Sequence, residues 1–268
     1  MPVSLAAPFS RALLAAPVSI ALLLAAATVG DAQAPPRFAQ WPNTDFDNAT
    51  VDLSEIISGG VGRDGIPAID DPDFLPAAEE DRLQPMEPVL TLELEGAPAR
   101  AYPLRYLTWH EIVNDEVAGI PVAVTFCPLC NTALVFDRRV EGETLTFGVS
   151  GNLRHSDMVM FDRQTESWWQ QAVGEGIVGD YAGVSLEPLV SWTESWESFR
   201  EAHPDGLVMA QPSANRPYGR NPYVGYDSNS EPFLYFGERP PHGIDPVARV
   251  VRVGDRAWPL ARLAREGE

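Results

Sequence analysis

Proline and glycine recur along the whole chain and limit the length of any regular element that it can form. The 268 residues include 25 prolines and 21 glycines. Proline lacks the amide hydrogen that helices and inner strands require, and glycine favours turns. Hydrophobic residues make up 45% of the chain, which suffices for a globular core. The sequence therefore predicts an α+β fold that is mainly β, with antiparallel hairpins, a few short helices and many loops.

The charge of the chain excludes several classes of partner. It carries 38 acidic residues against 19 basic ones, a formal net charge of -19. All the basic residues are arginines, so neither a lysine Schiff base nor the lysine of a phosphate-binding P-loop is available. An acidic surface repels nucleic acids and anionic lipids, whereas it attracts cations. We expect no nucleic-acid partner and no membrane contact beyond the amino-terminal segment.

That segment differs in composition from the rest of the chain. Arg11 is the sole charged residue before Asp31, and an apolar run rich in alanine and leucine extends over Ala12–Val29. The pattern is typical of a secretory signal peptide, residues 1–32, cleaved after Ala32. The protein is then periplasmic or secreted. The alternative is an uncleaved amino-terminal anchor.

The remaining chain divides into three parts. Residues 33–88 are acidic and rich in glycine and proline, which predicts an irregular segment that wraps the domain. Residues 89–248 contain both cysteines and most β-prone runs, and we expect them to form a β-rich core domain. Residues 249–268 repeat the hairpin-into-helix pattern of residues 92–107 without the cysteine strand that follows there. They are interpreted as the start of a second, truncated repeat, with chance similarity as the alternative.

Within the core, β-branched runs surround the two cysteines. Pro121–Phe126 and Thr132–Phe136 read as strands joined by a tight turn. Before them, Val89–Leu94 and Ala99–Leu104 predict a hairpin, and apolar spacing over Pro103–Val113 predicts a helix. Further strands are expected at Glu143–Gly148, Met158–Asp162, Trp168-Trp169 and Ile177-Val178, and a further helix at Ser191–His203.

Cys127-Pro128-Leu129-Cys130 is the sharpest chemical signal, and three interpretations of it remain open. Two thiolates at this spacing can bind one soft metal ion, for which zinc and copper(I) are the candidates. They can also exchange with the disulfide of a partner protein as a redox pair, in which case Cys127 and Cys130 are the catalytic residues. Alternatively, they form an inert structural disulfide in a non-catalytic envelope or interaction protein. Two cysteines exclude a disulfide framework.

A metal site needs more ligands than the cysteine pair supplies. His110 is the leading imidazole candidate, with Asp157 or Glu111 as a nearby carboxylate. Met158 and Met160 offer thioether sulfur for copper(I), although strand alternation makes them equally good core residues. The predicted ligand set is therefore Cys127, Cys130, His110 and Asp157.

Two weaker signals have ordinary structural alternatives. Ser150 follows Gly148-Val149 and lies near His155 and Asp157, which suggests a serine hydrolase, but Asn152 replaces the second glycine of the nucleophile motif. The glycine-rich Ser58–Gly65 segment could bind an anion through its amides. A structural turn is the favoured interpretation, because no lysine or helix start follows it.

Several short sequence segments, which occur in the same order along the chain, resemble the bacterial and archaeal domain-of-unknown-function family 3179. The resemblance extends over about Trp41 to Leu260 and rests on the following segments: Asp64–Asp70, Ala99–Leu104, Trp109–Asp115, Thr125–Ala133, Phe147–Gly151, Ser156–Trp168 and Asn221–Asp227. It implies a secreted or lipid-anchored protein with a cysteine pair in a β-rich domain, and it implies no established activity. His110 lies inside one of the segments that resemble the family, whereas His155 stands where the family pattern has an asparagine-like residue. His110 is therefore the better ligand candidate.

Overall fold

The computed structural model describes residues 38–253 and 256–266. These residues form three five-stranded sheets and two small two-stranded ones, accompanied by short helices. The sheets are joined by many loops, and most neighbouring strands run antiparallel. The fold is therefore α+β and mainly β, as the proline and glycine content predicts.

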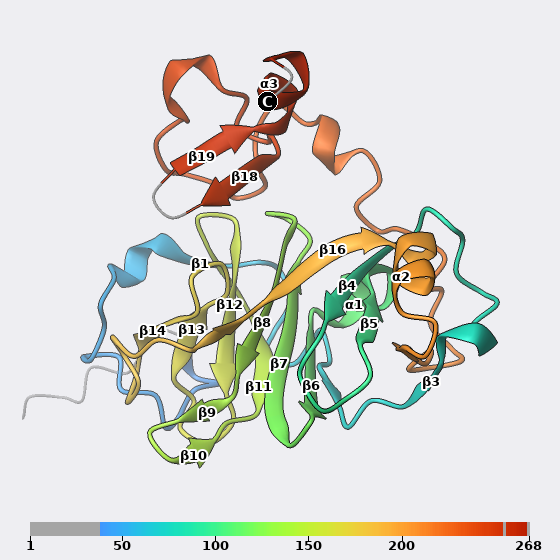
Figure 1. The fold of residues 1–268 in the computed structure, drawn as a ribbon. Coiled ribbons are helices and arrows are strands. Elements are labelled where there is room, and N and C mark those ends of the chain that lie inside the picture. Colours follow the sequence, from blue (N-terminus) through green and yellow to red (C-terminus); the bar gives the residue numbers. More distant parts are fainter. Residues whose placement is uncertain (1–37, 254–255, 267–268) are drawn as a thin grey trace, which may run out of the picture. The chain divides into compact units, whose positions relative to one another are not determined.

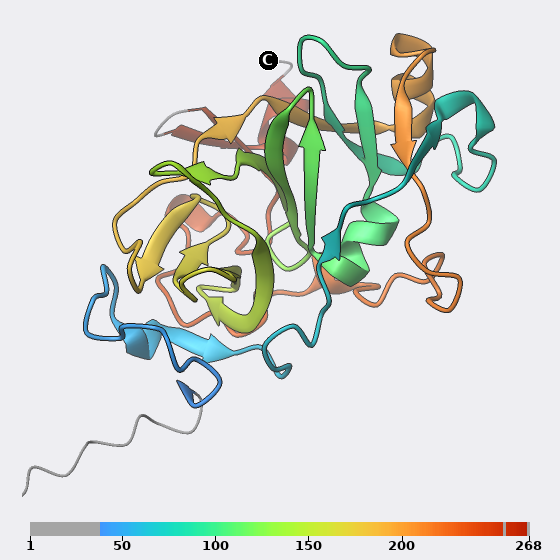
Figure 2. The ribbon, with the colours of Figure 1, turned by 90° about the horizontal axis from the view of Figure 1, so that it is seen from below.

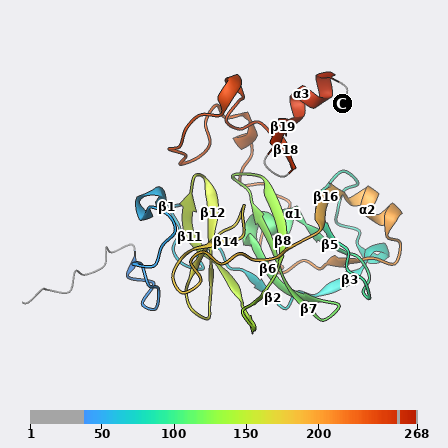
Figure 3. The same cartoon turned by 60° about the vertical axis from the view of Figure 1, so that its left-hand side comes forward.

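The cysteine pair belongs to the middle sheet, which lies between the other two five-stranded sheets in Figures 1 and 3. Its strands, in spatial order, are β15 (Pro188–Leu189), β8 (Thr132–Asp137), β7 (Ile120–Cys127), β6 (Ile112–Val117) and β2 (Ile69–Asp70).

A second five-stranded sheet carries Asp157, the acidic residue that lies beside the two cysteines. Its strands are β1 (Ile56–Ser58), β11 (Phe147–Arg154), β12 (Asp157–Asp162), β13 (Trp168–Gln170) and β14 (Glu175–Val178). Strand β11 contains a bulge between Val149 and Asn152, where its register against β12 shifts.

The third sheet and the helices complete the core. The strands are β16 (Ser191–Ser195), β4 (Pro88–Leu92), β5 (Arg100–Pro103), β17 (Leu207–Met209) and β3 (Phe74–Pro76). The helices are α1 (Leu104–His110), α2 (Trp196–Ala202) and α3 (Leu260–Glu266). The small sheets pair β9 (Arg139–Val140) with β10 (Glu143–Thr144), and β18 (Val250–Val253) with β19 (Arg256–Pro259).

Both faces of the middle sheet are buried, and strand alternation divides them. On β7, Val122, Val124 and Phe126 pack against α1 and the third sheet, whereas Ala123 and Cys127 pack against the second sheet. Successive side chains of a strand point to opposite faces, so the continuous apolar run of β7 serves two cores at once. This alternation turns the Cys127 thiol toward β12.

The predicted hairpins and the strands around the cysteines are confirmed, but two helix predictions were too long. Helix α1 ends at His110 because Glu111 takes a positive φ of 60° and β-branched residues then enter β6. The predicted helix over Ser191–His203 was wrong for its first five residues, which form β16 against β4. Ser195 caps α2 by accepting a hydrogen bond from the Ser198 amide, so the helix begins only at Trp196.

The amino-terminal part that the structure describes contributes both strands and packing residues. Within residues 33–88 it contains β1, β2 and β3, and Trp41 is buried against Phe161 and Trp168 of the second sheet. Figure 2 shows the first part of this segment, in blue, beside the second sheet, and its later part, in teal, running on toward the other two sheets. The predicted signal peptide, residues 1–32, lies outside the described residues. Among the described residues, no helix is both long and apolar enough to cross a membrane.

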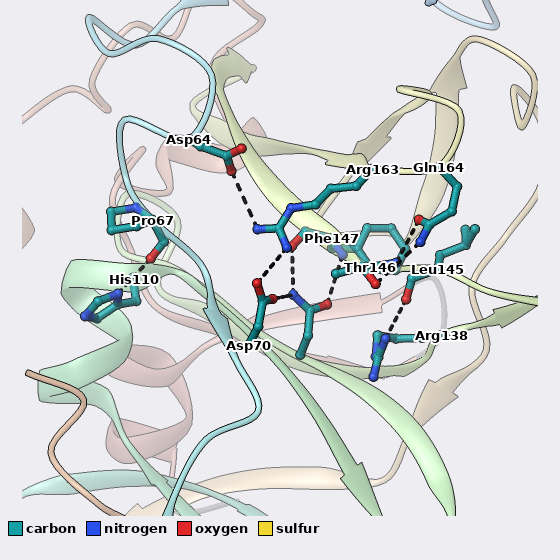
Figure 4. Close-up of polar contacts among 11 residues, drawn as sticks. Asp64, Pro67, Asp70, His110, Arg138, Leu145, Thr146, Phe147, Arg163 and Gln164 are labelled. Carbon is teal, nitrogen blue, oxygen red and sulfur yellow. Dashed lines mark hydrogen bonds and ion pairs between the residues drawn. The ribbon is translucent and has the colours of Figure 1, made fainter.

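A polar network fixes the Asp64–Asp70 segment to two sheets (Figure 4). Arg163 donates to Asp70 over 2.7 Å and approaches Asp64 at 3.9 Å. Asn114 donates to Asp70 over 2.8 Å, and its amide also pairs with the main-chain N–H and carbonyl of Phe147. Because Asn114 is on β6 and Phe147 on β11, this side chain joins the middle sheet to the second one.

Candidate metal centre

The two cysteines occupy opposite ends of the turn between β7 and β8. Cys127 is the last residue of β7 and pairs with Thr132, the first residue of β8. Asn131 takes a positive φ of 50°, a conformation that asparagine tolerates better than most residues. Cys127 is buried and Cys130 is exposed at this turn, and both are free thiols.

Asp157 meets the pair from the second sheet. The ligand atoms of Cys127, Cys130 and Asp157 all lie within 4.8 Å of one another. The Cys130 thiol donates a hydrogen bond to Oδ1 of Asp157 over 3.2 Å, and the Ala172 amide donates to Oδ2 over 3.0 Å. A distance of this size between two sulfurs and a carboxylate oxygen suits a single bound metal ion.

The surroundings of this group disfavour negative charge. Burial raises the pKa of the Cys127 thiol well above its ordinary value, and burial also raises the pKa of the Asp157 carboxyl. Among the described residues, Asp157 makes no ion pair with an arginine or histidine. The group therefore combines donors that are anionic when ionised, and no arginine or histidine of the described residues forms an ion pair with its carboxylate.

His110 lies outside the group that the structure brings together. Its Nδ1 is 2.7 Å from the carbonyl of Pro67, which fixes Nδ1 as the protonated nitrogen, and its Nε2 accepts from the Tyr218 hydroxyl over 2.8 Å. Burial lowers the pKa of His110, which agrees with a neutral ring. Figure 4 shows His110 at the end of α1, against Pro67. Both ring nitrogens are thus engaged in holding the Asp64–Asp70 segment and the Tyr218 side chain.

Ser150 and His155, the serine and the histidine of the hydrolase hypothesis, bind to different partners in the structure. The hydroxyl of Ser150 is buried, donates to the carbonyl of Val159 and accepts from the Asn152 amide at 3.0 Å. His155 approaches Glu55 instead, with 3.5 Å between its Nε2 and the carboxylate. Ser150 therefore stabilises the bulge in β11, and in the part of the chain that the structure describes its hydroxyl bonds to no histidine or carboxylate.

The glycine-rich segment is a structural turn, as favoured from its sequence. Its amides donate to main-chain carbonyls, Gly59 to Gly151 over 2.8 Å and Asp64 to Val149 over 2.9 Å. Gly151 has a φ of 77°, and a Cβ there would lie 2.3 Å from the carbonyl oxygen of Val61. The bulge in β11 therefore requires glycine at this position.

Two residues beside the cysteines were underrated at the sequence level. Glu111, weighed there only as a secondary metal ligand, is buried, and burial raises the pKa of its carboxyl to about 8. Tyr223 carries no motif that marks it as a site residue in the sequence. Burial, followed by the charges of Glu111 and Cys127, raises the pKa of Tyr223 to about 12. Both residues lie in segments that resemble the family, Trp109–Asp115 and Asn221–Asp227, and this is the one feature of the sequence that pointed to them.

Comparisons with known proteins agree with the resemblance read from the sequence. No curated protein matches the chain, and no solved structure matches it either. One family model, described as "Protein of unknown function (DUF3179)", matches residues 63–268. This range includes both cysteines, Asp157, Glu111 and Tyr223. Because the match spans more than half of the chain, the protein belongs to the DUF3179 family.

Proposed function

We propose that Cys127, Cys130 and Asp157 bind one zinc ion, with the fourth ligand supplied by solvent or by a small molecule. The observation that carries this proposal is the convergence of two sulfurs and one carboxylate within 4.8 Å at the mouth of a tight turn. Catalytic zinc sites typically use three protein ligands and leave one position open. The exposure of Cys130 supports such an open position.

The electrostatics of the group supports a bound cation. Buried thiols and carboxyls stay protonated when no positive charge is near, and burial raises the pKa of both Cys127 and Asp157. A divalent ion displaces these protons and supplies the charge that the described surroundings lack. The acidic chain, with a net charge of -19, also attracts cations to its surface.

The donor set favours zinc over copper(I). Zinc accepts thiolate sulfur and carboxylate oxygen together, whereas copper(I) prefers sulfur ligands. Met158 and Met160, the thioether candidates, are both buried in the apolar core between the second and middle sheets. A carboxylate therefore takes the place that a thioether would fill at a copper(I) centre.

Metal content and cysteine oxidation can be measured together by native mass spectrometry. The chain is produced in the periplasm, and its mass is recorded with and without added zinc and before and after reduction. We expect one zinc per chain in the reduced protein and a thiolate-to-metal absorption band when cobalt replaces zinc. Cys127→Ser and Cys130→Ser should each abolish tight loading.

A matched control uses an exposed carboxylate that lies away from the cysteines. Asp73→Asn should load zinc as the wild type does, because Asp73 is exposed and makes no ion pair among the described residues. A folded, reduced wild-type protein that binds no zinc, or that binds it equally after Cys127→Ser, contradicts the proposal. A bridge that persists between the two cysteines after mild reduction would instead support a structural disulfide.

Thiol–disulfide exchange is a second candidate, because one cysteine is exposed and the other buried. In that reaction the Cys130 thiolate attacks a partner disulfide, forms a mixed disulfide and releases one partner thiolate. Cys127, as its thiolate, then attacks the Cys130 sulfur and releases the second partner thiolate. Two electrons pass from the cysteine pair to the partner disulfide, which is reduced while Cys127 and Cys130 become oxidised.

The two candidates differ in what the Cys127→Ser variant does. Exchange predicts that this variant accumulates a mixed disulfide between Cys130 and the partner, detected as an adduct that reductant removes. Zinc binding predicts loss of metal and no such adduct. The burial that raises the pKa of Cys127 slows its attack as a thiolate, so we place metal binding first.

A further inference from the structure

A cavity of about 500 Å³ lies beside the cysteine turn. Leu129, between the two cysteines, and Met158, next to Asp157, line part of its wall. The rest comes from the bulged strand β11, from the glycine-rich segment, from residues 222–233, and from Ile66 and Glu111. Segments that are distant in sequence thus line one open cavity of the size that small organic ligands occupy.

The lining of the cavity is mainly apolar and aromatic. Val149 and Leu153 contribute from β11, and Ile66 contributes from the segment that the polar network of Figure 4 fixes in place. Residues 222–233 add Tyr223, Tyr226 and Phe233. The Tyr226 hydroxyl accepts a hydrogen bond from the Phe233 amide over 3.0 Å, which joins two of these aromatic residues.

Glu111 lines the same cavity with a carboxyl group that has no partner among the residues the structure describes. The residue is 6% exposed, and within the described ranges its carboxylate makes no hydrogen bond or ion pair. Its main chain is held from both sides, since its amide donates to Leu107 over 2.7 Å and its carbonyl accepts from Phe126 over 2.8 Å. The main chain therefore fixes Glu111 at the cavity wall, which its side chain helps to line.

The other buried carboxylates that the structure describes all have partners. Their partners are arginines, hydroxyls, a thiol, an indole or main-chain amides, and the residues are Glu80, Asp115, Asp137, Asp157, Asp162 and Glu166. A buried carboxyl without a partner destabilises the folded chain, and burial raises the pKa of Glu111 to about 8. A destabilising carboxyl group in the wall of a cavity indicates that a ligand supplies its missing hydrogen-bond donor.

We propose that the cavity binds a small organic ammonium ion, whose charged head pairs with Glu111 and whose apolar body packs against the β11 side of the wall. An ammonium head supplies the hydrogen-bond donors and the positive charge that Glu111 lacks. Tyr223, Tyr226 and Phe233 add aromatic faces, which attract organic cations. The net charge of -19 draws cations toward the chain. This binding site does not depend on a metal at the cysteines.

Phenethylamine, protonated at neutral pH, and phenethyl alcohol provide a matched pair of probes, because they share one shape and differ in the charged head. Binding of each to the full chain is measured by isothermal titration calorimetry in the presence of a metal chelator, at about pH 9, where the Glu111 carboxyl is ionised and the amine is still mostly protonated. We expect the amine to bind about tenfold more tightly than the alcohol, as expected for a charge-assisted hydrogen bond. Equal affinities for the two probes, or no binding of the amine, would overturn the proposal.

Two variants assign the preference to Glu111. Glu111→Gln should bring the affinities for amine and alcohol close together, whereas Glu116→Gln, an exposed carboxylate on β6, should keep the wild-type ratio. An unchanged ratio in a folded Glu111→Gln variant would contradict the assignment. Should that variant not fold, the wild-type comparison of the two probes still decides between an ammonium site and an indifferent apolar cavity.

Cys130→Ser separates this proposal from zinc binding. The variant removes one metal ligand and leaves the cavity wall intact, because Cys130 is not part of the lining. We expect the preference for the amine to persist in it, with or without added zinc. Loss of the preference in Cys130→Ser would assign the ammonium head to the cysteine centre and not to Glu111, and would overturn the inference.

Discussion

The Cys130 thiol donates a hydrogen bond to Oδ1 of Asp157 over 3.2 Å, although 27 positions separate the two residues in sequence. Cys130 belongs to the turn after β7, and Asp157 begins β12 on a different sheet. This contact makes a cysteine pair into a three-donor group. It is also the contact on which the zinc proposal is most directly tested.

Asp157→Asn should weaken zinc binding by roughly a hundredfold or more, because an amide is a far poorer zinc ligand than a carboxylate. Substitution of residues that only hydrogen-bond to metal ligands already lowers metal affinity by up to about a hundredfold. The fold should persist, because the asparagine oxygen can still accept from the Ala172 amide. Competition with a chromophoric chelator measures the affinity. Unaltered affinity in the variant would remove Asp157 from the ligand set.

His110→Gln tests the ligand that the sequence favoured and the structure places elsewhere. We expect the variant to load one zinc as the wild type does and to lose about 1–3 kcal/mol of unfolding free energy, because contacts to Pro67 and Tyr218 are disturbed. Metal analysis and urea denaturation give the two quantities. A folded variant without zinc would restore His110 to the metal site.

Ser150→Ala tests the hydrolase hypothesis. The wild-type protein should not react with a serine-directed phosphonate, because the Ser150 hydroxyl is buried and bonded to the main chain. The substitution should instead lower the unfolding free energy by about 1–2 kcal/mol, since the Asn152 amide loses its acceptor. Mass spectrometry detects labelling, and phosphonylation of Ser150 would reverse this interpretation.

Glu111 should make the protein less stable as the pH rises. Burial raises the pKa of its carboxyl from 4.5 to about 8, so between these values the folded chain retains a proton that the unfolded chain releases. The contribution of this group to stability therefore falls with rising pH, by up to about 1.4 kcal/mol per pH unit. Glu111→Gln should gain stability relative to the wild type as the pH is raised across this window.

Urea denaturation at several pH values checks this expectation, with Glu116→Gln as the matched control. Glu116 is exposed, so its replacement should leave the pH dependence of the wild type in place. A constant stability difference between wild type and Glu111→Gln across the window would show that the carboxyl ionises as freely in the folded chain as in the unfolded one.

Asn114→Ala should be among the more destabilising polar substitutions in the core. It leaves both main-chain groups of Phe147 without their partner and removes a donor to Asp70, a loss of about 3 kcal/mol. Gln164→Ala, at an exposed position that bonds the Thr146 amide, should change stability by only about 0.5 kcal/mol. Thermal or chemical denaturation compares them, and equal losses would contradict the role given to Asn114.

The local pattern of the sequence determined the strands around the cysteines and the class of the fold. β-Branched runs before Cys127 and after Cys130 require extended backbone, and the short interval between them requires a turn. Helix ends were less well determined. Glu111 ends α1 with a positive φ, and Ser195 starts α2 as its cap, and such single-residue events are weakly marked by apolar spacing.

The partners of the key side chains were decided by the tertiary structure. His110 and Asp157 were both in the ligand set predicted from the sequence, yet the packing of β12 against β7 brings Asp157 to the thiols, while Pro67 and Tyr218 engage His110. Likewise, nothing local indicates that Glu111 lacks a partner. Strand and helix patterns depend on neighbours along the chain, whereas hydrogen bonding, burial and the resulting pKa depend on which sheets and segments pack together.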